Sequence, residues 1–330
     1  MRWAHRLVAM FLSERPQGSR VVGSASSSGP APKARRAGLA VMVLGSLVVA
    51  CSDDDRPDAA GADPGAEPGV GEDQAVCPRD ELRVLVDDYF DALAAHDPTT
   101  LPLAAELRST ENGEQVEPGE GFWLTAGATG FKRSAFDVER CGTHTQAVLE
   151  EDGVEVVVGV RLQLADDEIT EIETYVTRDG DYMFFSPDGL VASDDEVTNV
   201  SWEELVPEES RATREELNDI ADLYFDSFGP AGVVAPIQRD CSRWENGQRT
   251  ADGDCTDGLP APGQLPDGFF TGQRYPITDV EAGIAIVYVS FGDALDFHMF
   301  KIVDGEVRLI QAVVTAPGHD TTAWEDQEQP

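Results

Sequence analysis

The sequence is poor in positive charge, with 24 Lys and Arg against 62 Asp and Glu in 330 residues and a formal net charge of −38. Seven of the basic residues and one acidic residue precede Cys51, which leaves 17 basic and 61 acidic residues in the remainder. Such a surface repels nucleic-acid phosphates and anionic lipid headgroups. We therefore expect no nucleic-acid partner, and the acidity favours solubility rather than a specific cationic partner.

Long hydrophobic runs are also scarce. The apolar run at residues 38–50 is short for a bilayer span. It follows a basic patch at residues 34–36 and ends Val-Val-Ala-Cys, the pattern of a secretory signal. That ending is similar to a bacterial lipobox, in which Cys51 becomes the lipidated first residue. The alternative is an ordinary signal peptide with an incidental cysteine. We predict export and lipid anchoring to a bacterial membrane, on its periplasmic or cell-surface side.

Several motifs of well-defined chemistry are missing. The sequence has no nucleophile elbow, no phosphate-binding loop and no nucleotide fingerprint. The cysteines lack the Cys-x-x-Cys spacing and the neighbouring histidine of a zinc site. We therefore predict no cofactor and no metal.

Composition divides the rest of the chain. The segment after Cys51 has almost no large apolar side chain and cannot bury enough surface to become ordered. Two segments that follow each contain a helical pattern and then strand patterns. We predict, in order, an N-terminal extension with signal peptide (1–50), a disordered acidic tether (51–76), a first module (77–185), a connection (186–210), a second module (211–316) and a disordered tail (317–330).

Each module begins with one helix and ends with strands. Apolar residues recur at helical spacing near the start of the first module, at Leu82, Leu85, Val86, Tyr89, Phe90 and Leu93. Thr213 and Glu216 predict a capping box at the second helix. Residues 154–164 alternate with the period of a strand. The predicted fold class is α+β, with two tandem cone-like modules, each a long helix wrapped by a curved antiparallel sheet.

The two modules are predicted to be copies of one unit. Four short matches occur in the same order at nearly constant shifts of 134 to 142 residues. They pair Tyr89-Phe90-Asp91 with Tyr224-Phe225-Asp226, Glu111-Asn112-Gly113 with Glu245-Asn246-Gly247, Asp137-Val138-Glu139 with Asp279-Val280-Glu281, and Ile172-Glu173 with Ile310-Gln311.

This arrangement resembles a known superfamily. A helix with Tyr-Phe-Asp, an irregular middle and a last strand reading Asp-Gly-x-Val-x-x-Ile-Gln are similar to the nuclear transport factor 2-like, or SnoaL-like, cone. The resemblance covers residues 77–183 and 211–316. It implies membership among polyketide cyclases, ketosteroid isomerases, dehydratases and non-catalytic binders, so the fold does not choose a function.

A narrower resemblance concerns the second module. The sequence Cys-Ser-Arg-Trp-Glu-Asn-Gly-Gln-Arg-Thr at 241–250, followed by Arg-Tyr-Pro at 274–276 and Asp-Val-Glu-Ala-Gly at 279–283, resembles a family of secreted domains of unknown function from fungi and bacteria. The resemblance implies no activity.

Four cysteines remain once Cys51 is lipidated. An even number in an exported protein favours disulfides, and four cysteines allow three pairings. One disulfide in each module is the simplest arrangement and pairs Cys77 with Cys141 and Cys241 with Cys255.

Two residues are weak candidates for acid–base chemistry. By the repeat, His298 stands on a strand face that is apolar in the first module, where a histidine suits proton transfer. The alternative is a histidine bonded to a core neighbour or turned outward. Glu173 is a candidate base in the first pocket, although a solvated strand face explains it equally.

A polar rim forms the candidate ligand-binding set. Arginine offers a planar fork to a carboxylate, and tryptophan can stack on a flat ligand. The alternatives are a structural turn, since Asn and Gly accept left-handed backbone angles, and aromatic residues that cap a core. The candidates are Arg243, Trp244, Glu245, Asn246, Arg249, Glu111, Asn112, Trp123 and Gln311.

Three functions stay open on the sequence. The leading hypothesis is a non-catalytic module that binds a small hydrophobic or mixed-polarity molecule at the cell surface, because a pocket is expected without a convergent catalytic set. The alternatives are an isomerase-, cyclase- or dehydratase-type enzyme with its site in the second cone, and a structural or interaction module whose pockets are filled by its own side chains.

Overall fold

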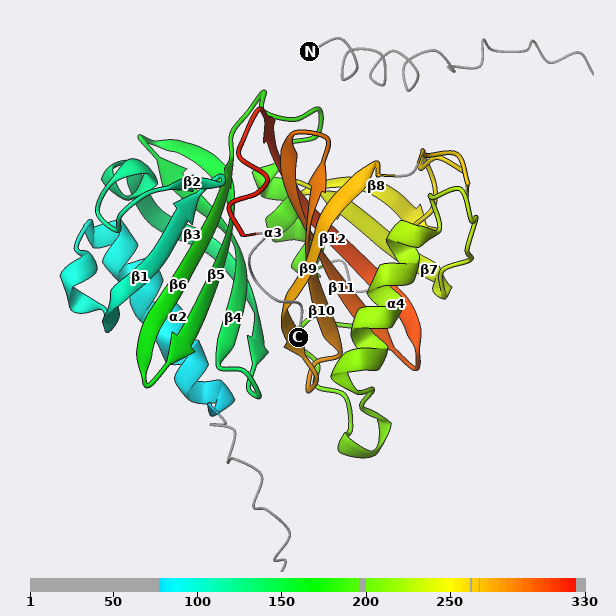
Figure 1. The fold of residues 1–330 in the computed structure, drawn as a ribbon, viewed down its shortest axis with the longest axis horizontal. Helices are drawn as coiled ribbons and strands as arrows, with labels where there is room; N and C mark the ends of the chain where they lie inside the picture. The colour runs from blue at the N-terminus through cyan, green and yellow to red at the C-terminus, as the bar shows by residue number, and fades with distance from the viewer. Residues whose placement is uncertain (1–76, 196–199, 262, 267, 325–330) are drawn as a thin grey trace, which may run out of the picture. The chain divides into compact units, whose positions relative to one another are not determined.

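The computed structural model describes residues 77–195, 200–261, 263–266 and 268–324 (Figure 1). The predicted signal peptide, Cys51 and the predicted tether lie outside these residues. Within the described part of the chain, no helix is both long and apolar enough to cross a bilayer.

The first module packs one long helix against one face of a six-stranded sheet, whose strand order is β2-β1-β6-β5-β4-β3 (Figure 1). Its elements are α2 (Arg79–Ala95), η1 (Pro98–Thr100), β1 (Leu103–Glu111), β2 (Glu114–Gln115), η2 (Gly121–Leu124), β3 (Ala126–Asp137), β4 (Gly142–Glu151), β5 (Val154–Ala165) and β6 (Glu168–Thr177).

The second module repeats this plan with strand order β8-β7-β12-β11-β10-β9, after a connection that contains two short helices. The elements are α3 (Pro187–Asp195), η3 (Glu208–Ser210), α4 (Arg214–Asp226), β7 (Ile237–Glu245), β8 (Gln248–Gly253), β9 (Phe270–Asp279), β10 (Ile284–Phe291), β11 (Ala294–Val303) and β12 (Glu306–Pro317). The matching strand orders agree with the predicted duplication.

Both long helices form where the sequence predicted them. The apolar stripe of α2 is buried against the sheet, and the helix ends at His96, whose backbone is left-handed with φ of 55°. The capping box of α4 is confirmed, because Thr213 accepts from the backbone N–H of Glu216 and the Glu216 carboxylate accepts from that of Thr213. Each helix covers one face of its own sheet.

The sheets differ from the prediction in one respect, because they are mixed rather than wholly antiparallel. Strand β1 runs parallel to β6, and β7 runs parallel to β12. A parallel pair needs a long connection, and the intervening strands of each module supply it by carrying the chain across the sheet and back. All other neighbouring strands pair antiparallel.

The modules share a third core formed by the sheet faces that point away from the helices. It contains Val148, Val157 and Tyr175 of the first module and Phe297 and Met299 of the second. Strands such as β5 are therefore buried on both faces. Each Å² of apolar surface removed from water stabilises the folded state by about 25 cal/mol. Burial of these side chains therefore favours the association of the two modules.

Charged contacts between the modules are reciprocal. Arg79 at the start of α2 bonds Asp279 at the end of β9 at 2.8 Å, and Arg214 at the start of α4 bonds Asp137 at the end of β3 at 2.5 Å. The same two aspartates accept backbone N–H groups across the interface, from Phe136 and from Thr278. Arg79 and Arg214 occupy equivalent positions in the two modules, and so do Asp137 and Asp279. Each arginine bonds the aspartate of the other module, which is the pattern of a two-fold interface within one chain.

Two segments expected to be irregular are packed. In the connection, Trp202 is buried and the Lys301 ammonium donates to the carbonyl oxygens of Trp202, Glu204 and Ala282. Residues 318–324, which the sequence placed in a disordered tail, lie against both modules and end at the buried Trp324. A single tryptophan anchors that segment, and composition alone did not reveal it. Residues 325–330 lie outside the described part.

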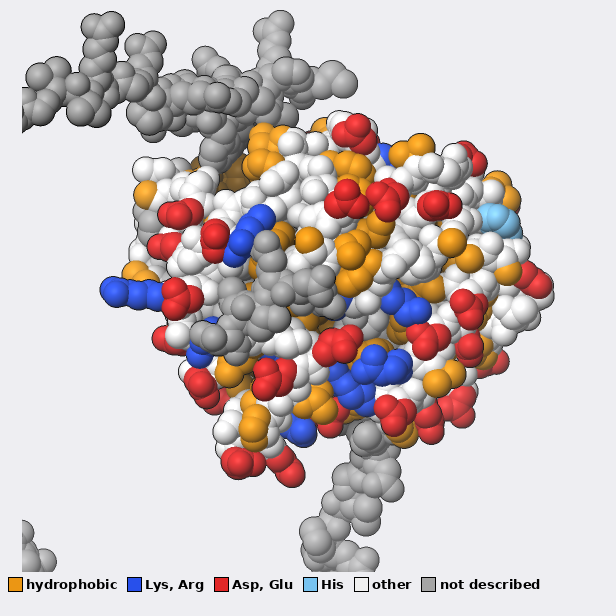
Figure 2. Space-filling view, turned by 180° about the vertical axis from the view of Figure 1, so that it is seen from behind, with side chains coloured by type: hydrophobic (Ala, Val, Ile, Leu, Met, Phe, Trp, Pro, Cys, Tyr) orange, Lys and Arg blue, Asp and Glu red, His pale blue; other side chains and the backbone are white. Residues whose placement is uncertain are grey.

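On the face that Figure 2 shows, acidic side chains are not gathered into one patch. Figure 2 shows them scattered across one face, with a few basic side chains between them. This distribution fits the role of the charge in solubility that the composition indicated.

Candidate functional site

The second cone contains a polar pair on its helix-facing wall. Strand alternation places Asp296, His298 and Phe300 of β11 on one face. The His298 ring lies 5.1 Å from the ring of Phe225 on α4 and stacks on Phe300 with centroids 5.7 Å apart. His298 therefore lies inside the cone, on the face that the repeat indicated for it.

The pair has unused hydrogen-bonding capacity. Nδ1 of His298 lies 3.2 Å from Oδ2 of Asp296, and the side chains are 9% and 4% exposed. The geometry is not that of a hydrogen bond, and neither Nδ1 nor Oδ1 of Asp296 has a partner among the described residues. A buried polar atom without a partner is unfavourable by about 1–3 kcal/mol. A group that enters this interior with a donor would relieve that cost.

Two tyrosines belong to the same polar surroundings. Burial raises the pKa of Tyr182, and the carboxylates of Glu245 and Asp296 raise it further. Burial also raises the pKa of Tyr224, where the Arg243 guanidinium opposes the two carboxylates. Both phenols therefore stay neutral and act as hydrogen-bonding groups beside Asp296.

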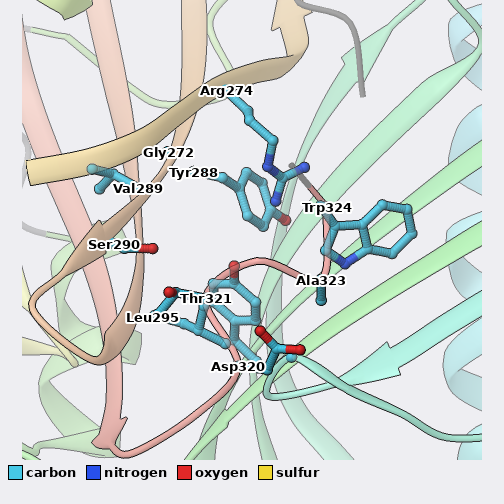
Figure 3. Close-up of a pocket in the computed structure, with 12 residues that line it drawn as sticks. Gly272, Arg274, Tyr288, Val289, Ser290, Leu295, Asp320, Thr321, Ala323 and Trp324 are labelled. Atoms are coloured by element: carbon cyan, nitrogen blue, oxygen red, sulfur yellow. The ribbon is translucent and has the colours of Figure 1, made fainter. Parts of the chain in front are cut away.

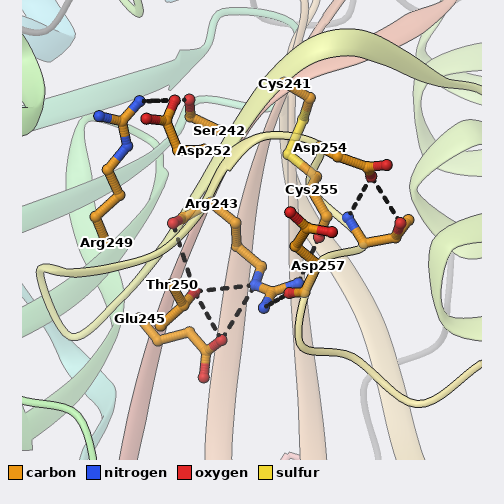
Figure 4. Close-up of a disulfide and its surroundings, with 11 residues drawn as sticks. Cys241, Ser242, Arg243, Glu245, Arg249, Thr250, Asp252, Asp254, Cys255 and Asp257 are labelled. Carbon is orange, nitrogen blue, oxygen red and sulfur yellow. Dashed lines mark hydrogen bonds and ion pairs between the residues drawn. A yellow bond between two sulfur atoms is a disulfide. The ribbon is translucent and has the colours of Figure 1, made fainter. Parts of the chain in front are cut away.

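Arg243 is committed to the disulfide loop. The structure contains the two disulfides that the sequence favoured, Cys77–Cys141 and Cys241–Cys255. The Arg243 guanidinium donates to Glu245 Oε1, Thr250 Oγ1 and the carbonyl oxygens of Cys255 and Asp257 (Figure 4). It thus ties β7 to the segment that follows β8, beside the disulfide, and it does not face outward to grip a ligand.

Arg249 and Trp244 have local or interior contacts. The Arg249 guanidinium bonds Ser242 and Asp252 (Figure 4) and lies over the Trp244 ring at 5.5 Å. Trp244 is buried in the core between the modules. Trp244 is therefore a core aromatic residue, which was the alternative to its stacking on a ligand.

The repeated Glu-Asn-Gly sequences form tight hairpin turns. Asn112 and Asn246 have φ of 47° and 45°, and each is followed by a glycine with positive φ. Each asparagine side chain then bonds a backbone N–H and a carbonyl on the last strand, at Val176 in one module and at Val314 in the other. These amides hold strands together, and the left-handed backbone of both asparagines agrees with the turn alternative.

The first cone contains a small, partly open pocket of about 10 Å³, room for one water molecule. Trp123 and Tyr89 line it, with ring centroids 5.5 Å apart. Glu111 also lines it, and its carboxylate accepts the backbone N–H of Phe122 at 2.6 Å. The strand positions equivalent to Asp296 and His298 are Val158 and Val160, so this cone lacks the polar pair.

Glu173 and Gln311 lie outside the cones, contrary to the expectation for Glu173. Ile172 packs toward α2, so its neighbour Glu173 points to the opposite face, between the modules. There Glu173 bonds Arg161 at 2.9 Å and Arg274 of the second module at 2.6 Å. Gln311 donates to Ser193 of α3. Of the two acid–base candidates, His298 alone lies inside a cone.

Sequence reasoning missed Asp296 and the cluster around Glu173. Asp296 was within reach, because it stands two residues before His298 on an alternating strand. Arg161, Arg274 and Tyr288 come from three strands, and only the packing of the sheets brings them together. Within the described ranges, no group of three or more His, Cys, Asp or Glu is placed to hold a metal ion.

Residues 210–314 match the family model described as Domain of unknown function (DUF8021), which spans the second module. No curated protein matches the chain.

Solved structures similar to this chain match about one module each. They include an NTF2-like protein of unknown function from Cytophaga hutchinsonii (15% identity, 29% of this chain and 88% of that one, TM-score 0.25). A second, from Burkholderia xenovorans, is an NTF2-like protein of unknown function (11%, 37% and 97%, TM-score 0.26). A third, from Catenulispora acidiphila, has a ketosteroid isomerase-like fold and is in complex with trimethylamine (15%, 28% and 83%, TM-score 0.23).

Proposed function

We propose that the second cone binds a small molecule with an apolar body and one hydrogen-bond donor, without transforming it. The observation that carries this proposal is the buried Oδ1 of Asp296, which has no partner among the described residues. The walls around it are aromatic, with Tyr224, Phe225 and Phe300 in mutual ring contact. A donor on the ligand bonds the carboxylate, and the apolar body packs among these rings.

The first cone serves as the structural partner of the second. Its helix-facing wall has valines where the second cone has Asp296 and His298, so it lacks this polar pair. Its outer sheet face supplies half of the core between the modules. One copy then holds the other in shape, and ligand binding is confined to one cone.

A pair of matched probes tests the proposal. In calorimetric titrations, 4-ethylphenol, which carries an O–H donor, should bind the full chain, and 4-ethylanisole, which lacks the donor, should bind more weakly. Asp296→Asn should weaken 4-ethylphenol about tenfold, because a bond to a charged acceptor is worth more than one to a neutral acceptor. Asp304→Asn changes an exposed turn carboxylate and should bind as the wild type does.

A second candidate is a purely structural pairing module. It is favoured by the small size of two pockets, one in the first cone and one between the modules, at about 10 Å³ each. Under it, neither probe binds and Asp296→Asn leaves every titration unchanged. That result would replace the binding proposal with the structural one.

We also propose that the protein is exported and held at a bacterial membrane through a lipid on Cys51. The two disulfides indicate an oxidising, extracytoplasmic environment and support export. Mass spectrometry of the mature N-terminus tests the anchor. A diacylglycerol-modified Cys51 is expected, and an unmodified N-terminus at another residue would contradict it.

A further inference from the structure

The chain's C-terminal strap, residues 318–324, crosses from the second module to the first. Its first two residues donate backbone N–H groups to the carbonyl oxygen of Asp293, at 2.8 and 3.2 Å. Its last residue, Trp324, is 3% exposed and donates its indole N–H to Thr110 Oγ1 at 3.0 Å. The strap is therefore fixed at its first residues by backbone hydrogen bonds and at its far end by the Trp324 side chain and its surroundings.

Three arginines from different strands surround the indole. Their guanidinium carbons lie 4.0 Å (Arg108, β1), 4.6 Å (Arg161, β5) and 5.8 Å (Arg274, β9) from the ring of Trp324. Arg108 also donates to the carbonyl oxygen of Ala323. The strap thus presents a flat aromatic ring, an N–H donor and an oxygen acceptor, and each has its own partner.

Two of these arginines are held in place without the indole. Glu173 bonds both Arg161 and Arg274, and Arg161 also bonds Glu171 at 2.7 Å. The Arg274 guanidinium lies over the Tyr288 ring at 5.0 Å, between that ring and Trp324 in Figure 3. A preformed surface of this kind keeps its shape when its occupant leaves.

The site also has space beside the strap. A cavity of about 10 Å³ adjoins the indole and is lined by Arg274, Tyr288 and strap residues including Asp320 and Thr321 (Figure 3). The strap therefore lies over a hollow between the modules and fills it incompletely.

We propose that the arginine cage of Arg108, Arg161 and Arg274 is a second binding site, outside the cones, for an indole or similar aromatic compound that carries a carbonyl or carboxylate oxygen. The strap occupies this site as an internal ligand, with Trp324 as the aromatic group and the Ala323 carbonyl as the acceptor. An external ligand binds when the strap withdraws.

Competition with the tethered strap explains why the site is covered. A short tether gives its own end an effective concentration of the order of mM, which weakens a free competitor by about a hundredfold or more. Loosening the strap should therefore reveal binding that the wild-type chain hides.

The first test removes the internal ligand. Trp324→Ala in the full chain should bind the probe N-acetyl-L-tryptophanamide about a hundredfold more tightly than the wild type in calorimetric titrations. Trp202→Ala is the matched control, because it also deletes a buried tryptophan that lies under an arginine. Equal binding to both variants would show a nonspecific packing hole and overturn the proposal.

The second test loosens the strap and leaves Trp324 intact. A side chain at Gly113 would overlap the carbonyl oxygen of Asp320, so Gly113→Ala should push the strap away and strengthen probe binding. Gly153→Ala is its control, because Gly153 has a similar φ, 82° against 81°, with nothing within 4 Å of the added carbon. Wild-type affinity in Gly113→Ala would count against displacement of the strap.

The third test concerns the oxygen acceptor. In the Trp324→Ala background, Arg108→Met keeps the aliphatic stem, removes the donor and should weaken N-acetyl-L-tryptophanamide about tenfold. The probe 3-methylindole, which has no oxygen, should lose less affinity than the amide, because it loses only the contact of the Arg108 guanidinium with its ring. If 3-methylindole binds as tightly as the amide, the assigned ligand class is wrong.

Discussion

His144 occupies the most water-free position among the described histidines. It is fully buried between the sheets, with Nδ1 2.9 Å from the Tyr288 hydroxyl and its ring 4.2 Å from that of Phe297. Burial, and to a smaller extent the nearby Arg161 charge, lower its pKa from 6.5 to about 3. The folded protein therefore holds this imidazole neutral near pH 7.

This depressed pKa predicts an acid-sensitive fold. Between pH 6.5 and 3 the unfolded state binds a proton at His144 that the folded state excludes, so stability is complete above pH 6.5 and falls as the pH drops. The slope approaches about 1.4 kcal/mol per pH unit for one proton. Urea unfolding at pH 7.5 and 5.5 measures it, before most carboxylates titrate.

His144→Gln should flatten that dependence, because the variant has no imidazole to protonate. His96→Gln, at the exposed end of α2, is the control and should keep the wild-type slope. An unchanged slope in His144→Gln would place the acid sensitivity elsewhere.

At the scale of elements, the loop between β8 and β9 is held by two devices. The Cys241–Cys255 disulfide ties the start of this loop to β7, and the Arg243 guanidinium bonds the loop's carbonyl oxygens at Cys255 and Asp257. Both therefore join β7 to the first residues of the same loop. Arg243, which the sequence analysis named as a candidate ligand-binding residue, instead holds this loop in place.

Removing the disulfide with Cys241→Ala and Cys255→Ala should lower the free energy of unfolding by about 3 kcal/mol, the loop-closure value for cysteines fourteen residues apart. Arg243→Met should then cost less than it does in the wild type, because its carbonyl acceptors are no longer held in place. Urea unfolding of the wild type, the disulfide variant, Arg243→Met and their combination gives the four free energies of this double-mutant cycle.

The other disulfide provides the control for that cycle. In a Cys77→Ala, Cys141→Ala background the full cost of Arg243→Met should persist, because that bond lies in the other module. Additive losses in both backgrounds would show that Arg243 and the Cys241–Cys255 bond stabilise independent regions.

At the scale of the whole molecule, the chain is built as a dimer within one polypeptide. The two sheets share a core, and two ion pairs, Arg79–Asp279 and Arg214–Asp137, join the modules. Both aspartate side chains are fully buried, so each carboxylate depends on its arginine and on backbone donors. The modules should therefore unfold together.

Arg214→Gln should lower the free energy of unfolding by about 3–5 kcal/mol, because it leaves a buried carboxylate without its charge partner. Arg79→Gln should cost less, since Arg79 makes one bond to Asp279 where Arg214 makes two to Asp137. Urea unfolding with probes in both modules should show one transition for each variant.

Arg83→Gln is the control on the exposed side of α2 and should cost about 1 kcal/mol or less, the value of its contact with the Phe136 ring. Two separate transitions in the wild type would contradict a shared core.

Prediction from sequence succeeded where the information is local. Helical spacing identified α2 and α4, and the residue types at Thr213 and Glu216 identified the capping box. Because Asn and Gly accept left-handed backbone angles, a turn at each Glu-Asn-Gly was one of the two interpretations, and both asparagines have positive φ. It failed for Glu173, whose neighbour Ile172 takes the helix-facing side, and for the tail, where one tryptophan decides the outcome.

By itself, the sequence determined the period of each helix and strand, the duplication and the turn positions, because these depend on residues close together along the chain. The tertiary structure alone decided that the outer sheet faces are buried against each other, that Asp296 and His298 share an interior wall, and that Trp324 lies among three arginines. Those arrangements depend on how the sheets pack, which brings together side chains from segments that no local pattern connects.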